Sequence, residues 1–333
     1  MRSLLAALAV FSSALFAQGA SETRVFPIAN IGTPQSMQEL VNAIRSLAEI
    51  QHVTADMPGR RLVITGDAEE LAFADWIVKA LDAPAGARPT AFTVRDTTYR
   101  DPRYATSVKL IYPAHIASPQ HLQEAVNAVR SIAEVQRVVG LTVQKALLMR
   151  AAPEQTALAE WLLQDFDQST GGAGSHETRQ YTYPDSLVQE RYRSTAVRIY
   201  HPTQIATPQQ MQEAINDIRS IAEVQRVVAF TGANLIALRS PEPQVAVADW
   251  LEKELDQPAS AASARSFPMP GDSSQTVHTF YLPKTAGPAD LQNSLNIIRQ
   301  HTGIQRPVVY QRNAAIILRG TPDQIDKAGA LLR

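Results

Sequence analysis

The chain has 333 residues, which suits two to four structural units, and it carries 31 basic and 32 acidic residues but no cysteine. The near balance of charge gives no long-range attraction to nucleic acid or to an anionic membrane surface. The absence of cysteine excludes disulfides, thiolate catalysis and thiolate metal sites.

The first 20 residues predict a cleaved secretory signal peptide. Arg2 supplies a positive charge, an apolar run follows from Leu4 to Phe16, and cleavage is expected after Gly19 or Ala20. A membrane-spanning helix needs roughly 20 apolar residues, and this run is shorter. We therefore expect an exported protein, in the periplasm or outside the cell, with no transmembrane segment once the signal is removed.

Two landmarks recur along the chain at matching intervals. Prolines that open a predicted helix follow one another after 85, 89 and 80 residues, at Pro34, Pro119, Pro208 and Pro288. Tryptophans recur after 85 and 89 residues, at Trp76, Trp161 and Trp250. Such internal repetition predicts four copies of one module. We number them modules 1 to 4 and expect them at residues 21–82, 107–167, 196–256 and 277–333.

The hydrophobic pattern of each copy predicts strands and helices in the order β-α-β-β-α. In module 1 we expect strands at 24–28 and 61–65 and helices at 34–50 and 67–81. In module 2 we expect strands at 108–112, 137–141 and 146–150 and helices at 119–135 and 153–166. In module 3 we expect strands at 197–201, 226–230 and 235–239 and helices at 208–222 and 241–255. In module 4 we expect strands at 279–282, 308–311 and 315–319 and helices at 288–302 and 321–332.

These elements predict an α+β fold of four tandem modules, each a small sheet with two helices on one face. A unit of about 60 residues is marginally stable by itself, so some packing between modules is expected. The segments 83–106, 168–195 and 257–276 are rich in Gly, Pro, Ala and Ser and are predicted to be linkers. They argue against one tight solenoid, and the sequence leaves open whether the modules stack or are strung on flexible linkers.

The fourth copy carries a family resemblance. Its opening strand at 278–282, the Asp290-Leu291 pair in its first helix and the Gly320-Thr321-Pro322 turn after an apolar strand resemble the N-terminal domains of bacterial secretins. Those domains form periplasmic rings in type II and III secretion and type IV pilus channels. The resemblance implies association between like modules in the periplasm, with protein partners such as a secretin-type complex, and an oligomer is compatible with it. The β-rich channel domain of secretins has no counterpart here, so channel function is not implied.

The order of strands and helices within each module is also similar to that of KH domains, which bind RNA. The modules lack the Gly-x-x-Gly loop and the basic face that such binding needs, so no nucleic-acid partner is expected. No histidine pair has the i, i+4 spacing of a helical metal site, and neither a nucleophile elbow nor a phosphate-binding loop is present. We expect no enzyme activity, no metal and no cofactor. The three tryptophans are expected in the core rather than in a ligand site.

Repeated basic residues are candidate contacts for a partner protein. In each copy, one basic residue lies on the first helix and another follows that helix. Together these residues could form a basic row that pairs with acidic residues on a neighbouring module or molecule, such as Glu39, Glu124 and Glu213. The alternative is a solvated face with internal ion pairs. Aromatic and basic pieces in the linkers are either contact residues or caps of neighbouring modules. The candidate partner contacts are Arg130, Arg137, Arg219, Arg226, Tyr99, Tyr104 and Tyr192.

Two functional hypotheses follow. The first is an exported, non-enzymatic scaffold or adaptor that acts by protein–protein contacts, in a secretion or pilus-type assembly of the cell envelope. The second is a periplasmic protein that binds a peptide or an envelope polymer in clefts between modules.

Overall fold

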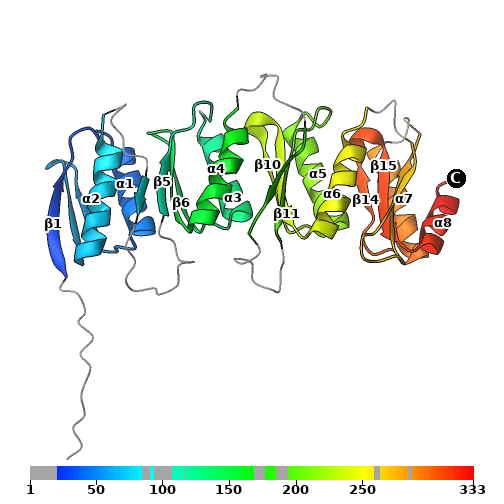
Figure 1. Cartoon of the computed structure of the whole chain (residues 1–333). Helices are drawn as coiled ribbons and strands as arrows, with labels where there is room; N and C mark the ends of the chain where they lie inside the picture. Colours follow the sequence, from blue (N-terminus) through cyan, green and yellow to red (C-terminus); the bar gives the residue numbers. More distant parts are fainter. Residues whose placement is uncertain are drawn as a thin grey trace, which may run out of the picture. The chain divides into compact units, whose positions relative to one another are not determined.

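The computed structural model describes residues 21–84, 91–93, 107–116, 118–168, 177–184, 194–258, 263–283 and 287–333. The predicted signal peptide lies outside this range. The chain separates into two compact units, Met1–Pro84 and Ala85–Arg333. The first unit contains module 1, and the second contains modules 2, 3 and 4 (Figure 1).

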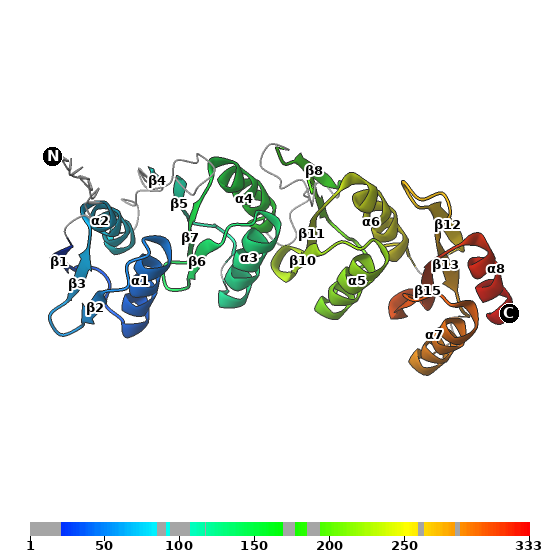
Figure 2. The ribbon, with the colours of Figure 1, turned by 90° about the horizontal axis from the view of Figure 1, so that it is seen from below.

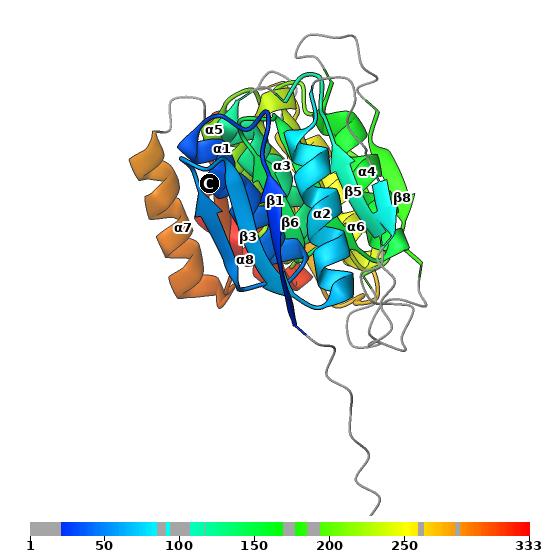
Figure 3. The same ribbon diagram turned by 90° about the vertical axis from the view of Figure 1, so that its left-hand side faces the viewer.

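Module 1 consists of a three-stranded antiparallel sheet and two helices. The sheet has the order β1-β3-β2, with β1 at one edge beside β3 (Figure 3). The elements are β1 (Glu22–Pro27), α1 (Pro34–Leu47), β2 (Val53–Asp56), β3 (Arg61–Gly66) and α2 (Ala68–Asp82). The strand β2 was not delimited in the sequence-based prediction for this module.

Modules 2, 3 and 4 each have a four-stranded antiparallel sheet and two helices. Module 2 comprises β4 (Ala91–Thr93), β5 (Ser107–Ile111), α3 (Pro119–Ile132), β6 (Arg137–Leu141), β7 (Ala146–Ala151) and α4 (Pro153–Phe166). Module 3 comprises β8 (Arg179–Thr182), β9 (Ala196–Tyr200), α5 (Pro208–Ile221), β10 (Arg226–Phe230), β11 (Leu235–Ser240) and α6 (Glu242–Leu255). Module 4 comprises β12 (Arg265–Pro268), β13 (Thr276–Tyr281), α7 (Pro288–Thr302), β14 (Val308–Tyr310), β15 (Ala315–Gly320) and α8 (Pro322–Leu331).

The predicted α+β class is confirmed, with four small antiparallel sheets that are each paired with two helices. The first helices begin where the sequence places a cap. Thr207 accepts a hydrogen bond from the Gln210 N–H at 3.2 Å, and Pro208 occupies the first turn, where its missing N–H leaves no bond unmade. Thr33 and Ser118 cap α1 and α3 in the same way. The predicted apolar stripe of α5 is buried at Met211, Ile215, Ile218 and Ile221.

The segments predicted to be linkers contribute strands. β4, β8 and β12 lie within 83–106, 168–195 and 257–276, and each pairs antiparallel with the first predicted strand of its module. The strands have only three or four residues and are flanked by Gly-, Ser- and Pro-rich sequence, so their hydrophobic alternation is too short to recognise. They form because an edge strand offers unpaired backbone groups to the neighbouring chain.

The sheet of module 3 is covered on both faces. One face packs on α5 and α6 of its own module, and the other packs on α3 and α4 of module 2 (Figure 2). Both β9 and β11 are buried along their whole length, as the unbroken apolar run Leu235–Leu238 requires. Modules 2, 3 and 4 therefore pack more closely than the linker composition led us to expect. The residues of module 3 that join the core of module 2 are Val197, Ile199, Phe230, Leu235 and Ala237.

In modules 1 to 3, a half-buried aspartate at the end of the last helix binds the loop that follows the first long strand. In module 3, the Asp256 carboxylate accepts the backbone N–H groups of Thr203, Gln204 and Ile205 at 2.8, 2.6 and 3.0 Å. Asp82 and Asp167 each accept three successive N–H groups in the same way. One carboxylate thus accepts hydrogen bonds from three backbone N–H groups of a loop that has no neighbouring strand to pair with.

Replacing Asp256 by alanine is expected to lower the free energy of unfolding of module 3 by about 1.5–3 kcal/mol, because hydrogen bonds to a charged acceptor are lost and three donors are left without it. Urea unfolding followed by tryptophan fluorescence measures the change. The matched control is Lys253→Ala on the same helix, whose exposed side chain predicts a change within about 0.5 kcal/mol. Equal effects of the two substitutions would contradict the fastening role.

Within the part of the chain that the structure describes, no helix has both the length and the apolar character needed to cross a membrane.

Candidate interaction site at the module junctions

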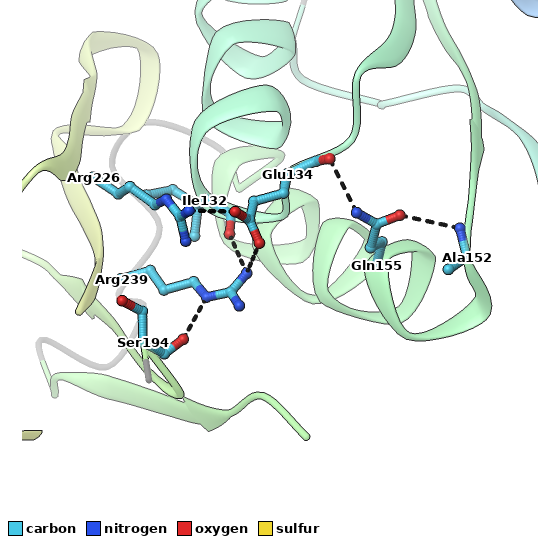
Figure 4. A network of polar contacts seen from close by, with 7 residues as sticks. All are labelled: Ile132, Glu134, Ala152, Gln155, Ser194, Arg226 and Arg239. Atoms are coloured by element: carbon cyan, nitrogen blue, oxygen red, sulfur yellow. Dashed lines mark hydrogen bonds and ion pairs between the residues drawn. The ribbon is translucent and has the colours of Figure 1, made fainter. Parts of the chain in front are cut away.

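The junction between modules 2 and 3 is built around Glu134. This residue follows the C-terminal end of α3 with a φ of 58°, in the left-handed region that side-chain-bearing residues seldom adopt. That conformation directs its carboxylate to module 3, where it pairs with the guanidinium groups of Arg226 and Arg239 (Figure 4). The Arg239 contact measures 3.2 Å. We call Glu134, Arg226 and Arg239 the Glu–Arg–Arg clamp.

Arg239 is the most completely buried charge of the clamp, with 1% of its side chain exposed. Its guanidinium also donates to the backbone carbonyls of Ser194 at 2.7 Å and Ile132 at 3.1 Å, and it lies 4.0 Å from the ring centroid of Tyr183. Burial lowers the pKa of Arg239, and the nearby Glu134 carboxylate opposes that effect. The clamp therefore joins the end of α3 to β11 through a buried charge that has one carboxylate and two backbone carbonyls as acceptors.

A second carboxylate of module 2, Glu124 in the N-terminal half of α3, also binds module 3. Glu124 accepts the backbone N–H of Thr231 at 2.8 Å and the Thr231 hydroxyl at 2.8 Å. Glu124 lies in the N-terminal half of α3 and Glu134 just after its C-terminal end, so the two contacts fix the direction of the helix across the sheet as well as its position.

Aromatic side chains fill the space between the polar contacts. Phe166 of α4 stacks on Phe230 of β10, with ring centroids 4.7 Å apart and planes 7° from parallel. Trp161 packs against Tyr181 of β8 at 5.3 Å, and Arg179 lies over the Trp161 ring while it pairs with the buried Asp165. Trp161 is thus half-buried at the junction and not inside the core of one module, where the sequence-based interpretation placed it.

The junction between modules 3 and 4 repeats this arrangement. Glu223, again with a φ of 58°, pairs with Arg306 at 2.9 Å and with Arg319 at 3.1 Å. Arg319 also donates to the Ile221 carbonyl at 3.3 Å. The remaining contacts match as well: Glu213 accepts the Gln311 N–H at 2.9 Å, Trp250 packs on Phe267 at 5.7 Å, and Arg265 pairs with Glu254 at 3.2 Å.

The two junctions differ beside the second arginine. No tyrosine at the position of Tyr183 covers Arg319, whose side chain is 20% exposed. Instead there is an open pocket of about 320 Å³, lined among others by Glu223, Gln275, Arg306 and Arg319. This pocket lies where a cleft between modules was predicted.

The second junction also buries a carboxylate that the first does not have. Asp217 of α5 stands where α3 has Ala128, and it is 4% exposed with one oxygen that has no partner in the protein. Burial raises the pKa of Asp217 well above its usual range, and the Glu213 carboxylate adds to the effect. The buried hydroxyl of Tyr310 in β14 is also without a protein partner.

Replacing the Asp217 carboxyl by an amide, in Asp217→Asn, is expected to stabilise modules 2 to 4 by about 1–3 kcal/mol at pH 7, because the unfolded chain ionises the carboxyl at this pH whereas burial opposes its ionisation in the folded protein. The pKa of Asp217 is raised on folding, so the contribution of this group to stability is greatest below the unfolded value of about 3.9 and falls as the pH rises toward the folded value. The advantage of the variant should therefore disappear near pH 4.

Urea unfolding of both proteins between pH 4 and 7 measures this difference. Burial also raises the pKa of Glu252, to about 7, but that group is present in both proteins and cancels in the comparison. An advantage that is independent of pH would contradict the assignment to the Asp217 charge.

The predicted contact residues have different positions. Arg226 belongs to the clamp, whereas Arg130 and Arg219 donate to carbonyls of their own modules, Val138 at 2.8 Å and Val227 at 3.2 Å. Arg137 begins β6, at the position that Arg226 has in β10. Contact with a separate partner protein stays a prediction for all of them, and Tyr99, Tyr104 and Tyr192 lie outside the described residues.

Sequence reasoning did not identify Glu134, or its equivalent Glu223, as a carboxylate that pairs with the next module. It paired the basic row with Glu124 and Glu213, which instead bind backbone N–H groups. A signal was present: Glu49, Glu134 and Glu223 occupy the position that Gly303 has in module 4. An interchange with glycine indicates a left-handed residue just after a helix, where a carboxylate leaves the helix axis.

In the described ranges, no group of three or more His, Cys, Asp or Glu side chains is arranged to hold a metal ion.

The chain is similar to several solved structures. One is the N-terminal domain of the secretin XcpQ from Pseudomonas aeruginosa, with 17% identity and a TM-score of 0.19 over 44% of this chain and 62% of that chain. Another is ExeD from Aeromonas hydrophila, with 13% identity and a TM-score of 0.17 over 90% of this chain and 59% of that chain. A third is the ETEC pilotin–secretin AspS–GspD complex, with 10% identity and a TM-score of 0.17 over 94% of this chain and 55% of that chain.

The chain thus spans less than two thirds of the length of each of these proteins. XcpQ and GspD are secretins. No family model matches the chain. No curated protein sequence matches it either.

Proposed function

We propose that the chain is an exported, non-enzymatic scaffold that acts by protein–protein contacts in a secretion or pilus-type assembly of the cell envelope. The observation that carries the proposal is the repeated junction. The charged and aromatic side chains that recur between modules hold neighbouring modules together, and the same set of contacts appears twice. A protein that acts by presenting surfaces at fixed spacing needs such junctions, since flexible linkers would not keep the spacing.

The resemblance of the fourth module to secretin N-terminal domains supports the cellular setting of the proposal. The predicted signal peptide supports export. The partner class that fits both is a protein of the cell envelope, such as a secretin-type complex, and the contacts would be of the kind by which like modules associate.

The test uses the chain from Ser21 to Arg333 as bait for envelope proteins of the organism that produces it. A variant with the substitutions Arg239→Ala and Arg319→Ala serves as the matched bait, since it loses one arginine that pairs with Glu134 and one that pairs with Glu223. We expect one defined set of proteins to be retained by the wild type and lost with the variant, because the spacing of the modules is what the partner recognises.

Two results would contradict the proposal. Binding of purified cell-wall fragments or peptides without any retained protein would favour the alternative, a binding protein that uses the pocket beside Arg319. A hydrolytic activity of the purified chain that one point substitution abolishes would show an enzyme.

A further inference from the structure

The junctions between modules have a direction. In both, the later module supplies the guanidinium donors, and the earlier module supplies the carboxylate acceptors on its helices. We call the first group the donor set, represented by Arg226 and Arg239 in module 3. We call the second the acceptor set, represented by Glu124 and Glu134 in module 2. An interface between two different surfaces is heterologous, and copies that carry both surfaces free join head to tail into rings or open filaments.

Module 4 lacks the acceptor set. At the positions of Glu213 and Glu223 it carries Asn293 and Gly303, and at the position of Trp250 it carries Ala330. In the described part of module 4, the face of α7 that matches the contact face of α5 also has no partner. α5 buries Ala214, Asp217 and Ile221 on that side, whereas the matching Ile297 of α7 is 41% exposed and His301 is exposed.

Module 1 lacks the donor set. At the positions of Arg226 and Arg239 it carries His52 and Thr65. Its sheet has a polar outer face in place of the apolar one of module 3. Thr23 bonds to Thr65 across that face at 2.7 Å.

The centre of the same face is also changed. Asp56 and Arg61, which replace Phe230 and Leu235, form an ion pair at 2.8 Å. Val25, at the position of the fully buried Ile199, is 57% exposed. A face with this composition has little apolar area to bury against a helix pair.

We propose that modules 1 and 4 are caps, and that copies of this chain therefore do not join head to tail. The outer sheet face of module 1 carries no donor set, and the outer helix face of module 4 carries no acceptor set, so a junction between module 4 of one copy and module 1 of another would lack both groups. Repeat proteins require terminal units with a polar outer face to stay soluble. This inference goes beyond the scaffold function and does not depend on the identity of a partner.

The test restores each missing surface separately in the chain from Ser21 to Arg333. The donor variant carries His52→Arg, Asp56→Phe, Arg61→Leu and Thr65→Arg. The acceptor variant carries Asn293→Glu, Ile297→Ala, His301→Ile and Gly303→Glu. Glutamate is acceptable at position 303, because Gly303 has a φ of 74° and Glu223 has one of 58° at the equivalent position.

Light scattering on a sizing column measures the mass of each protein and of their mixture. We expect the wild type and each variant alone to be monomers, and an equimolar mixture of the two variants to give a species of twice the monomer mass. A control acceptor variant with Gly303→Lys in place of Gly303→Glu should not form it. A mixture of folded variants that remains monomeric would overturn the proposal.

A second measurement keeps the proposal testable if the multiple variants fail to fold. The chain has no cysteine, so Val25→Cys and Ile297→Cys together place one thiol on each of the two faces. Under oxidation we expect no ladder of cross-linked copies from this double variant. A ladder that is absent from either single variant would show head-to-tail contact between wild-type faces and would overturn the proposal.

Discussion

Replacing Arg239 by alanine is expected to lower the free energy of unfolding of modules 2 to 4 by about 2–4 kcal/mol, because the carbonyls of Ser194 and Ile132 lose a buried charged donor, while Glu134 keeps Arg226 as a partner. Arg239 is buried and bonds to Glu134, to two backbone carbonyls and to the Tyr183 ring. Its loss therefore affects the end of α3, β11 and the segment before β9 together.

Urea unfolding followed by tryptophan fluorescence measures this effect. Arg24→Ala is the control for loss of an exposed arginine, because Arg24 forms a surface ion pair with Glu22 in module 1 and its removal should leave the unfolding of modules 2 to 4 unchanged. Arg319→Ala, at the more open second junction, should cost less than Arg239→Ala. An Arg239→Ala variant as stable as the control would show that the clamp does not hold the modules together.

Replacing Phe230 by alanine is expected to cost a similar amount, about 3–5 kcal/mol, because it removes a large buried side chain and leaves a cavity. Phe230 is 1% exposed, and its ring stacks on Phe166 of the preceding module. The cavity would therefore lie between modules, and both should become easier to unfold.

Hydrogen exchange of the backbone amides in α4 and β10 provides the measurement, with protection expected to fall on both sides of the junction. The matched substitution is Phe230→Leu, which introduces the residue found at the equivalent Leu141 of module 2 and should cost less than about 1.5 kcal/mol. Loss of protection in β10 alone would contradict a shared core.

The sequence patterns predicted the elements well where the hydrophobic period is long. The proline that opens α5, the cap at Thr207 and the buried stripe through Met211 and Ile218 follow from helix chemistry within one segment. The same holds for β11, whose unbroken apolar run indicates a strand. The short edge strands were missed because three or four residues carry too little periodicity.

The candidate site could be predicted only in part, since it depends on pairing between distant segments. Arg226 and Glu134 are 92 residues apart, and neither shows from its own surroundings which residue it meets. The repeat revealed that a basic residue recurs there, but it did not distinguish Glu124 from Glu134 as the partner. The left-handed turn after α3, which directs Glu134 to the next module, decides between them.

The role of the tryptophans shows the same limit. Helical spacing beside Leu and Ala correctly placed Trp161 and Trp250 toward apolar surroundings. Those surroundings are supplied by Tyr181 of β8 and Phe267 of β12, which belong to the following module. A pattern along one helix identifies a buried face, but it does not reveal which part of the chain covers it.

The most direct test of the junction is a double-mutant cycle between Glu134 and Arg239 in the chain from Ser21 to Arg333. The free energy of unfolding is measured for the wild type, for Glu134→Ala, for Arg239→Ala and for the double variant. If the clamp joins modules 2 and 3, the two substitutions are not additive, and the coupling energy is about 1–3 kcal/mol. Additivity within about 0.5 kcal/mol would show that the two residues act independently and would contradict the junction as described.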